Sequence, residues 1–195
     1  MDYSSYYKNR GVCFVLSGPS GVGKDTVLGY LKENISVNRV VTATTRTPRG
    51  EEKDGVDYDF MTEEEFLQKT KEDYFLEYAT FSGHYYGTPK KNIEKLINAG
   101  KNALLKIEVQ GAVNVKKLMP ETVLIFLAPP SIEFLEKRLR GRGTDSEEDI
   151  QRRLKTAQTE LEHIKYYDYL IINEDSKQTA EIVKGILTAK TLEIK

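Results

Sequence analysis

The chain has 195 residues, of which 39% are apolar and 30% are charged, and this length and composition suit one globular unit with small insertions. Lys and Arg number 29 and Asp and Glu number 30, so the formal net charge is −1. A charge this balanced argues against a general nucleic-acid binder, which needs a broad cationic surface.

Residues 1–10 are predicted to form a flexible tail, and they lack the apolar stretch of a signal peptide. The longest apolar run, Val123 to Ala128, is much shorter than a membrane span. Cys13 is the single cysteine, which excludes an internal disulfide, and its apolar neighbours predict a buried thiol. We therefore expect a cytoplasmic protein whose partners are neither nucleic acids nor membranes, and no oligomeric state is indicated.

Residues 11–195 alternate between short apolar runs, which predict strands, and stretches with helical spacing. Strands are predicted over residues 11–17, 40–45, 75–80, 84–88, 103–109, 123–127 and 169–172. A capping box at Thr62 begins one helix, with Phe66 and Leu67 turned inward, and Pro89 begins another that ends at Gly100. This alternation predicts an α/β fold in which a parallel sheet is flanked by helices on both faces.

Two stretches break the alternation. Residues 42–91 contain several short strands and predict an inserted subdomain, so the core would comprise residues 11–41 and 92–195. Residues 138–153 are charged and interrupted by glycines, a composition that favours a mobile lid over a core element.

The strongest local motif follows the first predicted strand. Its residues are Gly18, Pro19, Ser20, Gly21, Val22, Gly23 and Lys24. Glycines allow the backbone to curl so that its N–H groups point at phosphate oxygens, and the helix that follows adds its positive end. The motif therefore predicts a P-loop that binds a nucleoside triphosphate, with Lys24 reaching the terminal phosphates.

Asp25 stands where a P-loop usually carries the Ser or Thr that contacts Mg²⁺, and Thr26 follows it. A carboxylate next to a triphosphate is repelled unless a metal lies between them. Asp25 could hold a metal-bound water, or it could cap the helix while Thr26 serves the metal, and the sequence leaves both possibilities open.

A second anion site is predicted in the inserted segment. Arg46 and Arg49 flank Pro48 in one turn, and Tyr58 and Tyr86 bring phenolic hydroxyls from nearby segments. Two guanidinium groups and two hydroxyls that converge would hold a phosphate dianion through charge-assisted hydrogen bonds.

Together these segments resemble the guanylate kinases, which transfer a phosphoryl group from ATP to GMP. The resemblance is carried by GPSGVGK (18–24), TTRTPRGEEKDGVDYDF (44–60), FSGHYYGT (81–88), Gln110-Gly111, 128–131, 142–144 and Ile172-Asn173. It extends over residues 11–175 and implies a P-loop NTPase core, an inserted GMP-binding subdomain and a lid.

The resemblance also implies residue roles. Arg46, Arg49, Tyr58 and Tyr86 would take the GMP phosphate. The residues implied around guanine are Thr42, Glu77, Thr88 and Glu108. Asn173 would lie on the adenine side of ATP, and Arg138, Arg142 and Arg153 would close over the transferring phosphoryl group.

The chemistry of guanine agrees with a carboxylate at position 77. Guanine presents N–H donors on its Watson–Crick edge, whereas adenine presents a bare acceptor that would leave Glu77 unpaired, at a cost of more than about 1–3 kcal/mol. The family usually carries Asp-x-Asp before Gln-Gly, whereas this chain has Lys106-Ile107-Glu108. Glu108 keeps a carboxylate, and Lys106 reverses a charge.

The resulting prediction is ATP-dependent, in-line phosphorylation of GMP and dGMP to the diphosphates with Mg²⁺ as cofactor, in purine nucleotide metabolism and GMP recycling. No general base is needed because the attacking atom is an anionic phosphate oxygen, so catalysis would rest on alignment and charge neutralisation. The two alternatives are an inert guanylate-kinase-like module that binds peptides and a related sugar-phosphate kinase. The intact phosphate loop argues against the first, and the predicted base-reading residues argue against the second.

Overall fold

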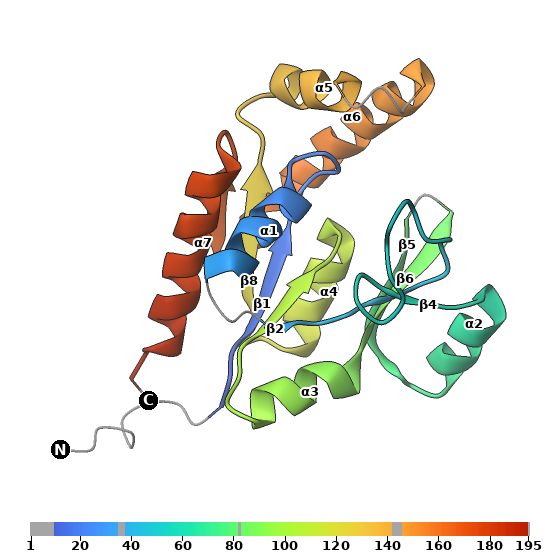
Figure 1. Cartoon of the computed structure of the whole chain (residues 1–195), viewed down its shortest axis with the longest axis vertical. Helices are drawn as coiled ribbons and strands as arrows, with labels where there is room; N and C mark the ends of the chain where they lie inside the picture. Colours follow the sequence, from blue (N-terminus) through green and yellow to red (C-terminus); the bar gives the residue numbers. More distant parts are fainter. Residues whose placement is uncertain (1–9, 35–37, 82, 142–145, 195) are drawn as a thin grey trace.

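A computed structural model of the chain describes residues 10–34, 38–81, 83–141 and 146–194. Two sheets of different size lie side by side, and a pair of helices lies at one end of the larger one (Figure 1). No helix within the described ranges is long and apolar enough to cross a membrane.

The larger sheet is parallel and has the strand order β2-β7-β1-β8-β9. Its strands are β1 (Cys13–Ser17), β2 (Asn38–Arg39), β7 (Ala103–Lys106), β8 (Val123–Ala128) and β9 (Tyr169–Ile172). Every residue of β1 and β8 is buried, which agrees with their uninterrupted apolar sequences because both faces of a parallel sheet are covered. The predicted fold class is confirmed.

Helices cover both faces of this sheet. The sequence alternation in β1 separates the two layers, because Phe14 and Leu16 belong to one apolar cluster while Cys13 and Val15 belong to the other. The first cluster includes α1 (Lys24–Asn34) and α7 (Ser176–Thr191), and the second includes α3 (Lys90–Asn98) and α4 (Val109–Leu118). The sheet is therefore a rigid base for the loops at its edge.

The smaller sheet has the order β4-β3-β6-β5 and lies entirely within residues 43–89. Its elements are β3 (Ala43–Thr44), β4 (Asp59–Phe60), β5 (Phe75–Phe81) and β6 (His84–Pro89), together with the helix α2 (Glu63–Lys71). Phe66 stacks on Phe75 and Tyr85, at ring-centroid distances of 4.4 and 5.3 Å. These rings form a small core that is separate from that of the larger sheet.

The helices α5 (Ile132–Arg140) and α6 (Glu147–Leu161) pack through a further apolar cluster that contains Leu135, Leu139 and Leu154. Arg140 joins the end of α5 to the start of α6 through Glu147, and it also pairs with Glu136. The lid predicted over residues 138–153 therefore falls on two packed helix ends, and its residues 142–145 lie outside the described residues.

Three details of the predicted elements are wrong. The strand expected over 103–109 ends at Lys106, because Val109, Ala112 and Val115 have helical spacing and bury one face of α4. The strand expected over 40–45 is confined to β3, Ala43–Thr44, and the chain before it forms β2 at Asn38–Arg39, which belongs to the other sheet. Leu67 is 41% exposed, since Phe66 alone fills the space beneath α2.

Candidate functional site

A cavity of about 300 Å³ opens at the carboxyl ends of β1 and β7 and reaches across to the smaller sheet. The phosphate loop forms one wall, and β5, β6 and the arginine turn after β3 form the other. All the residues expected around GMP line it, namely Thr42, Arg46, Arg49, Tyr58, Glu77, Tyr86, Thr88 and Glu108. The fold thus brings together side chains that are far apart in the sequence.

The phosphate loop joins β1 to α1 and depends on its glycines. Gly18 has a φ of 143°, and a Cβ there would lie 2.1 Å from the backbone oxygen of Leu127. Gly23 has a φ of 103°, and a Cβ there would lie 2.7 Å from Nδ2 of Asn173. Any side chain at either position would force the loop out of this shape.

Lys24 lies over the loop that precedes it. Its Nζ donates to the backbone oxygens of Gly18, at 2.5 Å, and Pro19, at 3.2 Å. The same Nζ is 3.9 Å from Oε2 of Glu108, the residue before α4. The ammonium of Lys24 therefore lies between the phosphate loop and Glu108, the carboxylate that the family resemblance places near guanine.

Two side chains brace the loop from behind. Asn173 donates from Nδ2 to the backbone oxygen of Val22 at 2.7 Å, and Arg138 donates from Nη1 to the same oxygen at 2.8 Å. Arg138 also donates to the backbone oxygen of Glu174. Both residues are absent from the cavity wall, so this structure gives them a bracing contact, and their roles toward ATP stay predictions.

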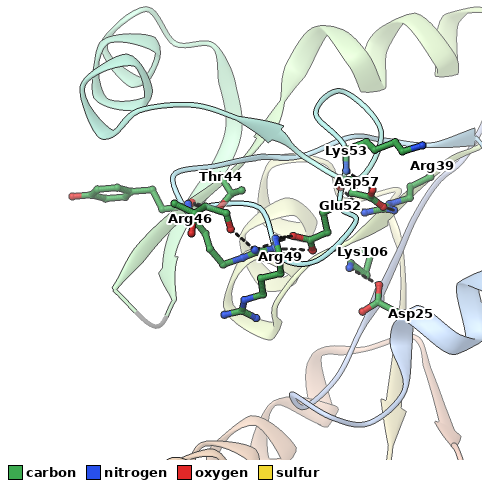
Figure 2. Close-up of polar contacts among 11 residues, drawn as sticks. Asp25, Arg39, Thr44, Arg46, Arg49, Glu52, Lys53, Asp57 and Lys106 are labelled. Atoms are coloured by element: carbon green, nitrogen blue, oxygen red, sulfur yellow. Dashed lines mark hydrogen bonds and ion pairs between the residues drawn. The ribbon is translucent and has the colours of Figure 1, made fainter. Parts of the chain in front are cut away.

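The arginine turn is organised by Glu52 (Figure 2). Arg46 donates from Nη1 and Nη2 to the two carboxylate oxygens of Glu52 at 2.9 and 3.0 Å, and Arg49 donates its backbone N–H to Glu52 at 2.7 Å. Arg46 is only 6% exposed. Although burial acts to lower the pKa of Arg46, the hydrogen bonds to Glu52 and Tyr86 raise it, so the guanidinium stays positively charged.

Tyr58 and Tyr86 complete this part of the cavity. Their rings meet edge to face at a centroid distance of 6.1 Å, and the guanidinium of Arg46 lies 5.4 Å from the ring centre of Tyr58. In Figure 2 the Arg49 side chain is directed away from the Glu52 carboxylate. The turn thus fixes the guanidinium of Arg46 against Glu52, while Arg49 lines the cavity with its side chain directed away from that carboxylate.

Glu77 is held at the strand pair opposite the loop. It is 8% exposed, it lies opposite Thr88 in the register of β5 and β6, and its Oε1 accepts from the Thr88 hydroxyl at 2.7 Å. Burial raises the pKa of Glu77, and the Thr88 bond offsets part of this effect. Gly111 on α4 lies against its other oxygen, since a Cβ there would be 2.8 Å from Oε2. The carboxylate therefore has one defined position.

Asp25 and Lys106 meet at the boundary between the two walls. Nζ of Lys106 donates to Oδ1 of Asp25 at 2.6 Å, and the same ammonium lies 5.4 Å from the ring centre of Tyr58. The side chain of Asp25 is thus bound to the end of β7.

Glu160 of α6 lies below the phosphate loop and is 9% exposed. Burial, and next the neighbouring Glu108, raise its pKa to about 7, while Lys24 and a backbone hydrogen bond from Ser20 act to lower it. Its Oε2 has no hydrogen-bond partner within the described part of the chain. A carboxylate buried in this way favours the protonated form near neutral pH.

The remaining expected site residues divide into three groups. Pro19, Ser20, Gly21, Gly23, Lys24, Asp25, Thr26 and Arg153 line the cavity. Gly18 and Val22 shape the loop from outside the cavity wall. Arg142 lies outside the described residues.

Sequence reasoning missed several residues of the site. Glu52 was missed although it follows Arg49 by three residues, which is a signal for a turn closed by a carboxylate. Arg39 donates to the backbone oxygen of Asp57 and also lines the cavity. No local pattern points to Arg39, since its position depends on the pairing of β2 with β7.

Known proteins resemble this chain along most of its length. A sequence model described as guanylate kinase matches residues 10–190. The guanylate kinase of Desulfitobacterium hafniense is 45% identical over 96% of this chain and 94% of its own, and that of Fusobacterium nucleatum is 49% identical over 91% and 96%. The crystal structure of guanylate kinase from Anaplasma phagocytophilum superposes with a TM-score of 0.81 at 38% identity, covering 96% of this chain and 89% of that one. The cavity joins a phosphate loop to an arginine turn, and the sequence matches guanylate kinases over nearly its whole length. The chain therefore belongs to the guanylate kinase family.

Proposed function

We propose that this protein phosphorylates GMP and dGMP at the expense of ATP, releasing GDP or dGDP and ADP. One observation carries the proposal: the phosphate loop and the arginine turn line the same cavity. A triphosphate at the loop and a monophosphate at the turn would then lie in one cavity, so that a phosphoryl group could pass directly from the first to the second. We also propose a cytoplasmic location, where both nucleotides are available as small-molecule substrates.

In this reaction an oxygen of the GMP phosphate attacks the γ-phosphorus of ATP, and the bond to the β,γ-bridging oxygen breaks as ADP leaves. Lys24 would neutralise charge from the donor side, and Arg46, Arg49, Tyr58 and Tyr86 would hold the acceptor phosphate. Alignment of two bound anions is the main contribution that such a site makes. Arg153 would add positive charge from α6.

Glu77, with Thr42, Thr88 and Glu108, would recognise the base. A buried carboxylate that accepts one hydroxyl hydrogen bond has an oxygen left for the N–H groups of guanine. Adenine offers no donor at the corresponding ring nitrogen, so it would leave that oxygen unpaired. This difference favours GMP over AMP.

Mg²⁺ fits this site as a partner of the nucleotide. Among the described residues no group of three or more His, Cys, Asp or Glu side chains could hold a metal by itself. Mg²⁺ usually binds through substrate phosphates and one or two protein oxygens, and Asp25 and Thr26 line the cavity beside Lys24. Bound with ATP, the ion would supply charge neutralisation at the phosphates.

The test is an acceptor panel that measures ADP release with GMP, dGMP, AMP, UMP and ribose 5-phosphate. We expect GMP and dGMP to be far ahead of the rest. Comparable turnover with AMP would contradict the role of Glu77, and turnover of the sugar phosphate would favour the sugar-phosphate kinase. Lys24→Ala should abolish turnover and leave GMP affinity mostly intact, which an inert peptide-binding module would not predict.

A further inference from the structure

Asp25 and Lys106 are 81 positions apart, and both depart from the pattern that the rest of the site follows. They contact each other directly, with 2.6 Å between Oδ1 and Nζ (Figure 2). Their exposures differ, because the Asp25 side chain is 79% exposed and the Lys106 side chain is 11% exposed. The pair therefore consists of an open carboxylate and a largely enclosed ammonium.

The position of Asp25 poses an electrostatic problem. It directly follows Lys24 and lines the same cavity, so its carboxylate faces the region that the phosphates of ATP would occupy. The positive end of α1 and the loop N–H groups attract anions, whereas a carboxylate in the first turn opposes that attraction. An uncompensated Asp25 would weaken the binding of a polyphosphate.

Lys106 supplies the compensation. Burial acts to lower the pKa of Lys106, but Tyr58 and Asp25 raise it, so the ammonium stays charged. The Asp25 side chain is largely exposed, so the partial desolvation that acts to raise its pKa is outweighed by the charge and hydrogen bond of Lys106, which lower it, and both groups are ionised. Lys24 and Arg39 also lower the pKa of Asp25, but Lys24 donates to the backbone oxygens of Gly18 and Pro19 and Arg39 donates to that of Asp57. The hydrogen bond to the Asp25 carboxylate comes from Lys106.

We propose that Lys106 is a positioning residue that neutralises Asp25, so that the phosphate loop can bind a nucleoside triphosphate despite the carboxylate beside Lys24. This inference rests on the proposed binding of ATP at the loop. Lys106 acts through Asp25, which gives it a signature that a direct phosphate ligand would lack: its removal matters only while Asp25 is charged.

A double-mutant cycle tests this dependence. ATP binding is measured by calorimetry in EDTA, so that no metal contributes, for wild type, Lys106→Met, Asp25→Asn and the double variant. We expect Lys106→Met to weaken ATP binding about tenfold, equivalent to about 1.4 kcal/mol. Asp25→Asn should bind ATP at least as tightly as wild type, and the double variant should return to within about threefold of wild type.

Three outcomes would overturn the proposal. An unchanged ATP affinity in Lys106→Met would show that Asp25 needs no counter-charge. If Lys106→Met costs the same affinity in the wild-type background and in the Asp25→Asn background, Lys106 is a direct ligand of the phosphates. GMP affinity, measured in the same variants, should change little, and a matching loss there would place the effect at the acceptor.

Controls distinguish a failure of this proposal from misfolded variants and from a failure of the proposed function. Lys106→Arg keeps the charge and should keep ATP affinity near that of wild type, while melting temperatures report any loss of structure. If wild type binds ATP and phosphorylates GMP, a negative result in the cycle counts against the role of Lys106 alone. If wild type does neither, the proposed function itself fails.

Discussion

Replacing Glu160 with Gln should stabilise the protein increasingly as the pH rises. Burial, with Glu108 as the second cause, raises the pKa of Glu160 from 4.5 to about 7 in the folded chain. The folded state therefore holds a proton that the unfolded state releases between these values, and the free energy of unfolding falls as the pH rises through that window. Glutamine has no proton to lose at this position.

The size of the effect follows from the shift. A change from 4.5 to about 7 corresponds to a cost of up to about 3 kcal/mol above pH 7, at about 1.4 kcal/mol for each pH unit. Wild type and Glu160→Gln should thus have similar stabilities near pH 4.5. The gap should widen through pH 7 and stay constant beyond it.

Urea unfolding followed by circular dichroism at pH 5, 6, 7 and 8 measures this gap. Glu148, an exposed residue on the same helix, offers the matched control, and Glu148→Gln should follow the wild-type profile because solvent surrounds its carboxylate. If the gap between wild type and Glu160→Gln is the same at pH 5 and pH 8, the carboxylate is not protonated in the folded state and the reasoning is refuted.

Two further predictions concern the acceptor side. Glu52→Ala removes the two hydrogen bonds that Arg46 donates to the Glu52 carboxylate, so steady-state kinetics should show a KM for GMP about tenfold higher with a smaller change in kcat. Glu51→Ala, at the exposed neighbouring position, should match wild type, and equal KM values in the two variants would contradict the role of Glu52. Gly111→Ala places a methyl group 2.8 Å from the position of Glu77 Oε2 and should displace that carboxylate. The ratio of kcat/KM for GMP to kcat/KM for AMP should therefore fall, although alanine does not weaken the helix. An unchanged ratio would show that Glu77 does not recognise the base.

The sequence predicted the large sheet, the phosphate loop and the arginine turn because these rest on strong local signals, whereas Thr42, Glu77, Thr88 and Glu108 were expected only through the resemblance to guanylate kinases. Buried parallel strands are uninterrupted apolar runs, and the phosphate loop needs glycine where φ is positive, as at Gly18 and Gly23. The arginine turn was found through Pro48 and its two flanking arginines. In each case one short segment determines both its conformation and its chemistry.

Other features depend on contacts between distant segments, and the sequence did not reveal them. Arg138 and Asn173 both reach the Val22 oxygen, 116 and 151 positions away. Glu160 is acidic in a helix that is otherwise rich in exposed charges, and only its burial beneath the loop distinguishes it. Val109 was expected to end a strand but begins α4, because its side chain is buried on one face of that helix together with Ala112 and Val115.

The stack of Phe66, Phe75 and Tyr85 gives the smaller sheet an interior of its own, separate from that of the parallel sheet. A change in the smaller sheet can then be accommodated by repacking these rings, with the phosphate loop on the other sheet left in place. Most of the side chains proposed to bind GMP and those proposed to bind ATP thus lie on separately packed parts, so variants could diverge in the first set while they keep the second.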